Sequence, residues 1–257
     1  PFEVGSLVNT VKKQMRRPVD IDQDLIAVDS SSVETLKLAR RVSQTDVSVL
    51  LNGESGVGKE VYSRFIHQNS SRSDAAFVAI NCAAIPENML EAVLFGYEKG
   101  AFTGAHKTTM GKFEQAQGGS LLLDEITEMD LGLQAKILRV LQEKEVERLG
   151  SNRVIELDVR IIATTNRDLR EEVREKRFRE DLFYRLNVFP ITIPSLRQRG
   201  DDIIPIASKI LAQYSRAAGE TIRLSDAACE LLRDHQWPGN VRELDNVIQR
   251  ALILKQG

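Results

Sequence analysis

Short runs of apolar residues alternate with longer stretches of helical spacing over the first three quarters of the chain. Val47–Leu51, Ser120–Glu125 and Val159–Asn166 are rich in Val, Ile and Leu, as buried strands of a parallel sheet are. After the first run, apolar residues at Val61 and Phe65 have the spacing of a helix. This alternation predicts an α/β fold with a parallel sheet.

The last quarter of the chain has a purely helical pattern. Pro190–Pro194 brackets a short extended run that ends the α/β part. Ile203–Ala217 repeats apolar residues with a period near 3.6, Ser225 is suited to cap a second helix, and Val241–Leu254 predicts a third. We therefore expect three segments: residues 1–24 as a linker after an upstream domain, 25–194 as the α/β part, and 195–257 as a small helical part.

Composition narrows the class of protein. The 257 residues are 42% hydrophobic and carry a net charge of −2, so a large core is possible and no general attraction to nucleic acid is expected. The basic residues of Arg167–Arg179 alternate with acids and indicate a solvated helix face. Cys82 and Cys229 have no metal or disulfide spacing, which is typical of buried thiols in a reducing cytoplasm.

A glycine-rich segment follows the first predicted strand and opens a helix. Backbone N–H groups of such a loop can close on phosphates at a helix N-terminus, where the helix dipole favours anions. Lys59 would supply the point charge on the β- and γ-phosphate oxygens of ATP. The strand–loop–helix context favours this interpretation over a chance glycine-rich turn. The predicted nucleotide-binding residues are Gly53, Glu54, Ser55, Gly56, Val57, Gly58, Lys59 and Glu60.

Two carboxylates end the second predicted strand. Asp124 and Glu125 follow three leucines and should lie at the carboxyl edge of the sheet, where open α/β sheets bind ligands. We expect Asp124 to hold Mg²⁺ and Glu125 to orient and polarise the attacking water. Glu60 stands where many phosphate loops carry Ser or Thr for the metal, which places more of the metal binding on Asp124. Alone, the pair could be a surface strand end.

Two further motifs carry a family resemblance. Gly100–Ala105 reads Gly-Ala-Phe-Thr-Gly-Ala, and Trp237–Leu244 reads Trp-Pro-Gly-Asn-Val-Arg-Glu-Leu. Both resemble, letter for letter, motifs of the AAA+ ATPases that activate bacterial sigma-54 RNA polymerase. The resemblance runs from about Leu25 to the end of the chain. It implies a P-loop α/β subdomain followed by a small helical lid.

The resemblance also implies that the chain is a piece of a longer response regulator. Pro1–Lys13 is similar to the last helix of a receiver domain, although an ordinary linker helix is equally consistent with it. Members of the family usually continue beyond the lid into a helix-turn-helix domain that binds DNA.

The resemblance assigns roles to residues around the nucleotide. It places Asn166 as a sensor of the γ-phosphate and Asn81 as a switch that pairs with the catalytic Glu125 until ATP is detected. Ile26 would pack near adenine, although relatives usually have Gly in place of its neighbour Ala27, which puts nucleotide affinity in doubt. Plain strand-end asparagines are the alternative for Asn166 and Asn81.

Three arginines would act at or across a subunit boundary. Arg179 and Arg185 are similar to arginines that point at the ATP of a neighbouring subunit, and a solvated helix face is the alternative. Arg242 would reach the phosphates of its own subunit from the lid. A ring of six or seven subunits follows from the resemblance, with each ATP at an interface.

The hexapeptide would be the output element. Its residues Gly100, Ala101, Phe102, Thr103, Gly104 and Ala105 should form a turn that exposes Phe102 and Thr103 for contact with sigma-54. Val146–Leu157 alternates apolar and polar residues around Gly-Ser-Asn and predicts a supporting β-hairpin. We therefore expect an ATP-driven remodeller of the sigma-54 holoenzyme. A helicase or unfoldase of the AAA+ class, and a non-hydrolysing sigma-54-binding scaffold, are the alternatives.

Overall fold

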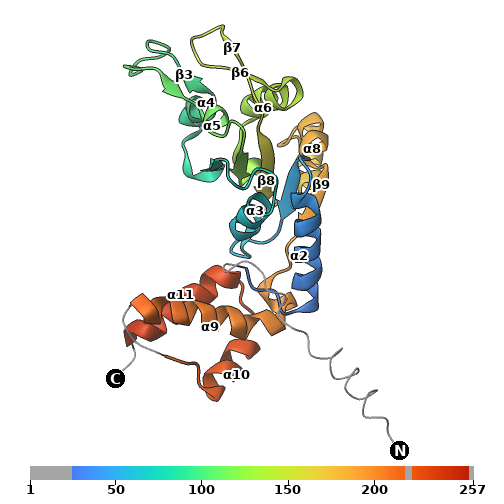
Figure 1. The fold of residues 1–257 in the computed structure, drawn as a ribbon, viewed down its shortest axis with the longest axis vertical. Coiled ribbons are helices and arrows are strands. Elements are labelled where there is room, and N and C mark those ends of the chain that lie inside the picture. Colours follow the sequence, from blue (N-terminus) through green and yellow to red (C-terminus); the bar gives the residue numbers. More distant parts are fainter. Residues whose placement is uncertain (1–24, 218–221, 255–257) are drawn as a thin grey trace, which may run out of the picture. The chain divides into compact units, whose positions relative to one another are not determined.

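The computed structural model describes residues 25–217 and 222–254 (Figure 1). The helix expected within Pro1–Lys13 and the linker of residues 1–24 lie outside the described residues. The described residues fall into two compact units. The α/β unit comprises Lys37–Ile193, and the helical unit combines the described parts of Pro1–Leu36 and Pro194–Gly257. Residues 25–36 thus group with the helices, whereas the sequence pattern had assigned them to the α/β part.

A five-stranded parallel sheet forms the centre of the α/β unit, which confirms the predicted fold class. Its order is β2-β5-β8-β1-β9, and every neighbouring pair runs in parallel. The three predicted central strands are present with ends that differ by a few residues. The strands are β1 (Val49–Asn52), β2 (Phe77–Asn81), β5 (Ser120–Asp124), β8 (Arg160–Thr165) and β9 (Phe189–Thr192).

Apolar side chains explain why these strands are central. Leu121, Leu122 and Leu123 of β5 are all buried, as are Ile161 to Ala163 of β8, so both faces of these strands are covered. Helices connect the strands, as a parallel sheet requires. They are α3 (Lys59–Gln68), α4 (Glu87–Phe95), α5 (Lys112–Gln115), α6 (Leu131–Glu143), α7 (Leu169–Arg174) and α8 (Glu180–Leu186), with short 3₁₀ turns η1 (Cys82–Ala84) and η2 (Ile126–Glu128).

Two small antiparallel ribbons lie outside the main sheet. β3 (Gly96–Tyr97) pairs with β4 (Thr109–Met110), and β6 (Glu145–Glu147) pairs with β7 (Val154–Glu156), which confirms the predicted hairpin. A bridge between Tyr97 and Leu149 joins the two ribbons. Figure 1 shows both at the same end of the α/β unit, beside α4, α5 and α6.

The helical unit has its own apolar core. It contains η3 (Leu196–Gln198), α9 (Gly200–Ala217), α10 (Asp226–Asp234) and α11 (Asn240–Leu254), and α2 (Ser30–Ser43) begins in it. Trp237 and Leu244 are buried in this core, and Ser225 caps α10 by accepting from Ala228 N. Asn240 Oδ1 accepts from Leu196 N at 2.8 Å, which ties α11 to η3.

No helix among residues 25–217 and 222–254 is long and apolar enough to span a bilayer.

Candidate functional site

The glycine-rich segment forms a loop between β1 and α3. Gly58 precedes α3 with φ 104°, a left-handed conformation that a residue with a side chain adopts only at a cost. The loop thus leads directly into the N-terminus of α3, where the first N–H groups of a helix have no intrahelical partners. Glu60 is exposed, and its carboxylate pairs with Arg64 one turn later.

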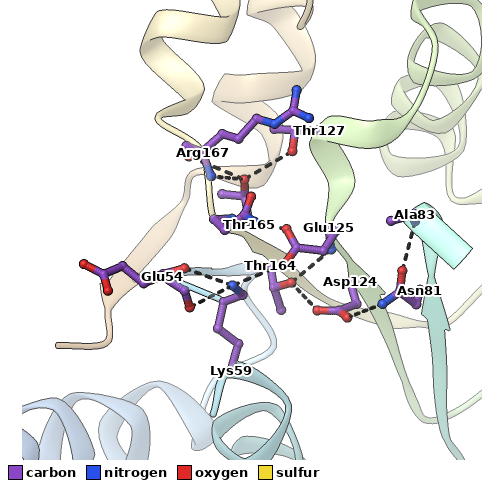
Figure 2. A network of polar contacts seen from close by, with 12 residues as sticks. Glu54, Lys59, Asn81, Ala83, Asp124, Glu125, Thr127, Thr164, Thr165 and Arg167 are labelled. Atoms are coloured by element: carbon purple, nitrogen blue, oxygen red, sulfur yellow. Dashed lines mark hydrogen bonds and ion pairs between the residues drawn. The ribbon is translucent and has the colours of Figure 1, made fainter. Parts of the chain in front are cut away.

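Lys59 is the first residue of α3, and its side chain is 7% exposed. Its ammonium donates to the Gly53 carbonyl at 2.9 Å and to the Glu54 carbonyl at 3.4 Å, and it lies 3.3 Å from Glu125 Oε1 (Figure 2). A buried ammonium is stable only with such partners. The structure thus brings the predicted phosphate-binding lysine and the predicted catalytic glutamate into direct contact.

Asp124 is held from both sides at the end of β5. Its Oδ1 accepts from the Thr164 hydroxyl at 2.5 Å, and its Oδ2 accepts from Asn81 Nδ2 at 3.0 Å. Each partner stands on a strand adjacent to β5, at the same edge of the sheet. The carboxylate plane is therefore fixed by its two neighbouring strands.

Asn81 differs from its expected pairing. Its amide contacts Asp124 instead of Glu125, and its Oδ1 accepts from Ala83 N and Ala84 N, so that it caps η1. Its position explains this arrangement, because Asn81 and Asp124 face each other in the register of β2 and β5.

Glu125 has an unusual backbone. Its φ of 55° and ψ of 56° lie in the left-handed region, which costs a non-glycine residue about 1–2 kcal/mol. Thr164 Oγ1 accepts from Glu125 N at 3.1 Å, and Glu125 Oε2 accepts from Asn166 N at 3.2 Å. Local strain of this kind clusters at functional sites. The contacts place Asn166 beside Glu125 by its backbone.

The Cys82 thiol is buried close to the carboxylates of Asp124 and Glu125. Burial and the neighbouring carboxylates of Asp124 and Glu125 raise the pKa of Cys82 to about 12, so the thiol stays neutral. Cys82 is buried as the sequence predicted, whereas Cys229 is only half-buried; both are free.

Sequence reasoning missed the threonines of this site. Thr164 and Thr165 are fully buried, and Thr165 Oγ1 lies 3.4 Å from Thr127 Oγ1. The only sequence signal was a pair of polar residues at the end of an apolar strand, which does not tell which carboxylate each hydroxyl contacts.

Of the two candidate trans-acting arginines, Arg179 is the N-cap residue of α8 and Arg185 lies in the last turn of that helix. Arg179 forms two hydrogen bonds with Asp181, and Arg185 donates to the Leu141 carbonyl through Nε and Nη2. Ile26 and Arg242 belong to the helical unit. Ile26 is partly buried there, and Arg242 is exposed on the first turn of α11.

The Gly100–Ala105 segment forms a tight loop, which we call the output loop. Gly100 N donates to the Ala105 carbonyl at 2.9 Å, and Ala105 N donates to the Phe102 carbonyl at 3.0 Å. Phe102 is 45% exposed and packs edge-on against Tyr97, and Thr103 is exposed. The predicted exposure of Phe102 and Thr103 is confirmed, while Ala105 is buried.

Arg148 connects the two ribbons. Its guanidinium forms a bidentate pair with Glu114 at 2.8 and 2.7 Å and reaches Glu98 at 2.9 Å. Arg148 holds the pKa values of both carboxyls below their usual range, with Thr108 contributing the larger share at Glu98. Gly150 follows closely, and a β-carbon there would lie 2.8 Å from Ala101 Cβ. The second ribbon is thus packed directly beneath the output loop.

Comparison with known families agrees with this geometry. The sigma-54 interaction domain matches residues 25–192, and the AAA+ ATPase lid domain matches residues 197–257.

Two curated relatives match all or most of the chain. The response regulator protein FleR of Pseudomonas aeruginosa is 55% identical over 260 residues, spanning 100% of this chain and 55% of that protein. A Nif-specific regulatory protein of Enterobacter agglomerans is 50% identical over 232 residues, spanning 90% of this chain and 45% of its own length. The chain thus spans about half the length of the curated relatives it matches.

A solved structure of NtrX from Brucella abortus in complex with ATP is similar in fold. It is 35% identical, has a TM-score of 0.83, and the match covers 97% of this chain and 56% of that one. With the family matches, the site geometry and the relatives in agreement, this chain belongs to the sigma-54 interaction domain family of AAA+ ATPases.

Proposed function

We propose that this chain binds and hydrolyses ATP and uses the energy to move its output loop against the sigma-54 RNA polymerase holoenzyme. The observation that carries the proposal is the separation of two sites within one compact unit. Lys59, at the end of the phosphate loop, contacts Glu125 at the sheet edge, whereas Phe102 and Thr103 are exposed on a ribbon outside the sheet.

Phosphoryl transfer needs positioning and charge more than covalent chemistry. The Lys59 ammonium would bind the phosphate oxygens of ATP. A bound phosphate would therefore compete with the Glu125 carboxylate for contact with Lys59. Glu125, released from Lys59, would orient a water toward the γ-phosphorus. The water oxygen would then bond to the γ-phosphorus as the bond from the γ-phosphorus to the bridging oxygen breaks, and the proton lost by the water would pass to the phosphate or to solvent, giving ADP and inorganic phosphate. Asn166, beside Glu125, would contact the water or the γ-phosphate.

The residues at the edge fit Mg²⁺ as the accompanying metal. Mg²⁺ is usually held by one or two carboxylates plus substrate phosphates, and Asp124 offers hard oxygen donors fixed in one plane. No group of three or more metal-ligating side chains was found among the described residues, and a site of this type does not need one. When bound, the metal would neutralise charge that develops on the phosphates.

Assembly completes the proposed site. Arg179 and Arg185 would leave Asp181 and the Leu141 carbonyl to contact the ATP of a neighbouring subunit, in a ring of six or seven. Ile26 and Arg242 would bring the base and phosphates under the control of the helical unit. Contact with DNA, if the full-length protein carries a helix-turn-helix domain, would be made outside this chain.

The test measures the ATPase rate per subunit against protein concentration for the wild type, Lys59→Ala and Thr103→Ala. We expect a rate that depends on Lys59 and climbs with concentration, and a Thr103→Ala variant that hydrolyses ATP but no longer binds sigma-54. Ser71→Ala is the control, because it removes an exposed hydroxyl elsewhere on the α/β unit. It should change neither the ATPase rate nor sigma-54 binding.

Each alternative has its own outcome. A rate that is independent of Lys59 would indicate a non-hydrolysing scaffold. A rate that is flat with concentration would argue against the trans-acting arginines, and sizing the same samples would identify a preassembled ring. Retained sigma-54 binding by Thr103→Ala would remove the proposed role of the output loop. The family membership already favours sigma-54 activation over a helicase or unfoldase.

A further inference from the structure

One buried hydroxyl contacts both residues that carry the proposed chemistry. β5 and β8 pair in register through Leu123 and Ala163, so the next residues along, Asp124 and Thr164, lie side by side at the sheet edge. Thr164 is fully buried, and Figure 2 shows its side chain between Asp124 and Glu125.

The Thr164 hydroxyl acts as both a hydrogen-bond donor and an acceptor. It donates to Asp124 Oδ1 at 2.5 Å and accepts from Glu125 N at 3.1 Å. A threonine hydroxyl has one proton, so the bond to Asp124 fixes where that proton points and leaves its lone pairs toward Glu125. A hydrogen bond to an ionised carboxylate is shorter and stronger than a neutral one.

The second hydrogen bond gives the backbone N–H of Glu125 a partner where the sheet pairing ends. The pairing of β5 with β8 ends at Leu123, and the backbone of Glu125 adopts the left-handed conformation. A buried N–H without a partner costs about 1–3 kcal/mol, and Thr164 supplies the partner for Glu125 N. The hydroxyl thus fixes the point at which Glu125 leaves the strand, and with it the direction of the side chain that meets Lys59.

Packing alone does not require a hydroxyl here. The preceding residues of β8, Ile161 to Ala163, are apolar and buried, and valine has nearly the shape of threonine. Asn81 holds the other oxygen of Asp124, but it leaves the backbone of Glu125 untouched. Thr164 therefore links the two residues in a way that neither Asn81 nor the sheet pairing does.

We propose that Thr164 is a positioning residue for ATP hydrolysis, which sets the Asp124 carboxylate and the Glu125 backbone in their working relation. The inference rests on the proposed ATPase function. It deepens that function by adding a residue that touches neither substrate nor metal. Residues that orient a metal-binding side chain typically change metal affinity or activity about 10-fold to 100-fold when lost.

The test compares Thr164→Val, Thr164→Ser and the wild type. Thr164→Val should lower kcat about 10-fold to 100-fold with a nearly unchanged KM for ATP. Thr164→Ser, which keeps the hydroxyl, should recover most of the rate. A second readout needs no turnover: the affinity for a fluorescent ADP analogue should be unchanged in EDTA, while the gain in affinity on adding Mg²⁺ should shrink in Thr164→Val.

Thr35→Val is the matched control. Thr35 is buried, and its hydroxyl donates to the Ser31 carbonyl within α2, so its loss removes a buried hydroxyl away from the sheet edge. It should leave kcat and the Mg²⁺ effect unchanged. Unfolding midpoints of all variants show whether the fold is kept.

The outcomes separate this inference from the proposed function. If hydrolysis by the wild type does not depend on Lys59, the proposed function fails. If it does depend on Lys59, and Thr164→Val keeps kcat within 2-fold or Thr164→Ser loses as much as Thr164→Val, the positioning role is overturned. If Thr164→Val does not fold, Thr164→Ala is read in the same way. Failure of both to fold would also overturn the proposal, since the hydroxyl would then serve the fold.

Discussion

Arg148→Ala is the change whose local effect the structure defines most fully. The variant removes the guanidinium that pairs with Glu114 and Glu98 and leaves the Glu114 carboxylate, 6% exposed, with a single weak backbone contact from Gly111 N at 3.3 Å. Removing one partner of a fully buried pair costs about 3–5 kcal/mol. Because the Arg148 side chain is 20% exposed, water reaches part of this pair, and we expect about 2–3 kcal/mol.

The lost stabilisation should first increase local opening where the two ribbons meet. Glu98 N donates to the Leu149 carbonyl, and Leu149 N donates to the Gly96 carbonyl, across the contact that Arg148 clamps. Local opening that becomes easier by this amount corresponds to amide exchange of Glu98 and Leu149 that is about 30-fold to 150-fold faster. Hydrogen exchange measured by NMR or mass spectrometry gives these rates directly.

The pH dependence supplies an independent check. Arg148 lowers the folded pKa of Glu114, so the pair stabilises the protein above the unfolded pKa of glutamate, about 4.3. The stabilisation is lost as the pH falls through the lowered folded pKa, where Glu114 binds a proton. The difference between wild type and Arg148→Ala should therefore be full at pH 7 and disappear in acid.

Two variants make the result interpretable. Arg148→Ala combined with Glu114→Gln removes the stranded charge and should recover part of the loss. Arg139→Ala removes an exposed arginine that pairs with Glu143 within α6, and it should leave exchange in the ribbons unchanged. Exchange rates of Glu98 and Leu149 that stay within 3-fold of the wild type in Arg148→Ala would refute the reasoning.

Two more predictions follow from close contacts and burial. Gly150→Ala should displace the output loop and weaken sigma-54 binding while ATP hydrolysis continues, because its new β-carbon would lie 2.8 Å from Ala101 Cβ. Gly118→Ala is the control for backbone strain, since Gly118 has a similar positive φ and no atom lies within 4 Å of its β-carbon. Equal sigma-54 binding by both variants would contradict the steric argument. At pH 8, iodoacetamide should modify the half-buried Cys229 and leave Cys82 unmodified until the protein unfolds. The reason is that the burial and raised pKa of Cys82 suppress its thiolate. Peptide mass spectrometry that finds equal labelling of Cys82 and Cys229 in the native protein would contradict this prediction.

The sequence predicted the elements whose signals are local. A run of leucines before Asp124 identified a buried strand and its polar end, and the glycine-rich loop identified the start of α3. Alternation around Gly-Ser-Asn predicted the β6–β7 hairpin. Each of these depends on residues within about ten positions of one another, where spacing and turn chemistry decide the conformation.

Contacts between distant segments could not be predicted in the same way. Thr164 meets Asp124 only because β8 lies beside β5 in a particular register, and no pattern within either strand specifies that register. The same holds for Arg148, which follows β6, and Glu114 of α5, which are 34 positions apart. Asn240 is a further case, because the contact of its Oδ1 with Leu196 N joins residues that are 44 positions apart.

The path from the sheet edge to the output loop is short along the chain. Asn81 ends β2 with its amide on Asp124 and its Oδ1 on the first N–H groups of η1, and α4 begins a few residues later and ends at Phe95, immediately before β3. A helix moves as a rigid element, so a shift of the Asp124 carboxylate that reorients Asn81 acts on the chain that leads into α4. The ribbon that carries Phe102 follows α4 directly. Because Thr164 holds the other oxygen of Asp124, we expect its bond to oppose such a shift.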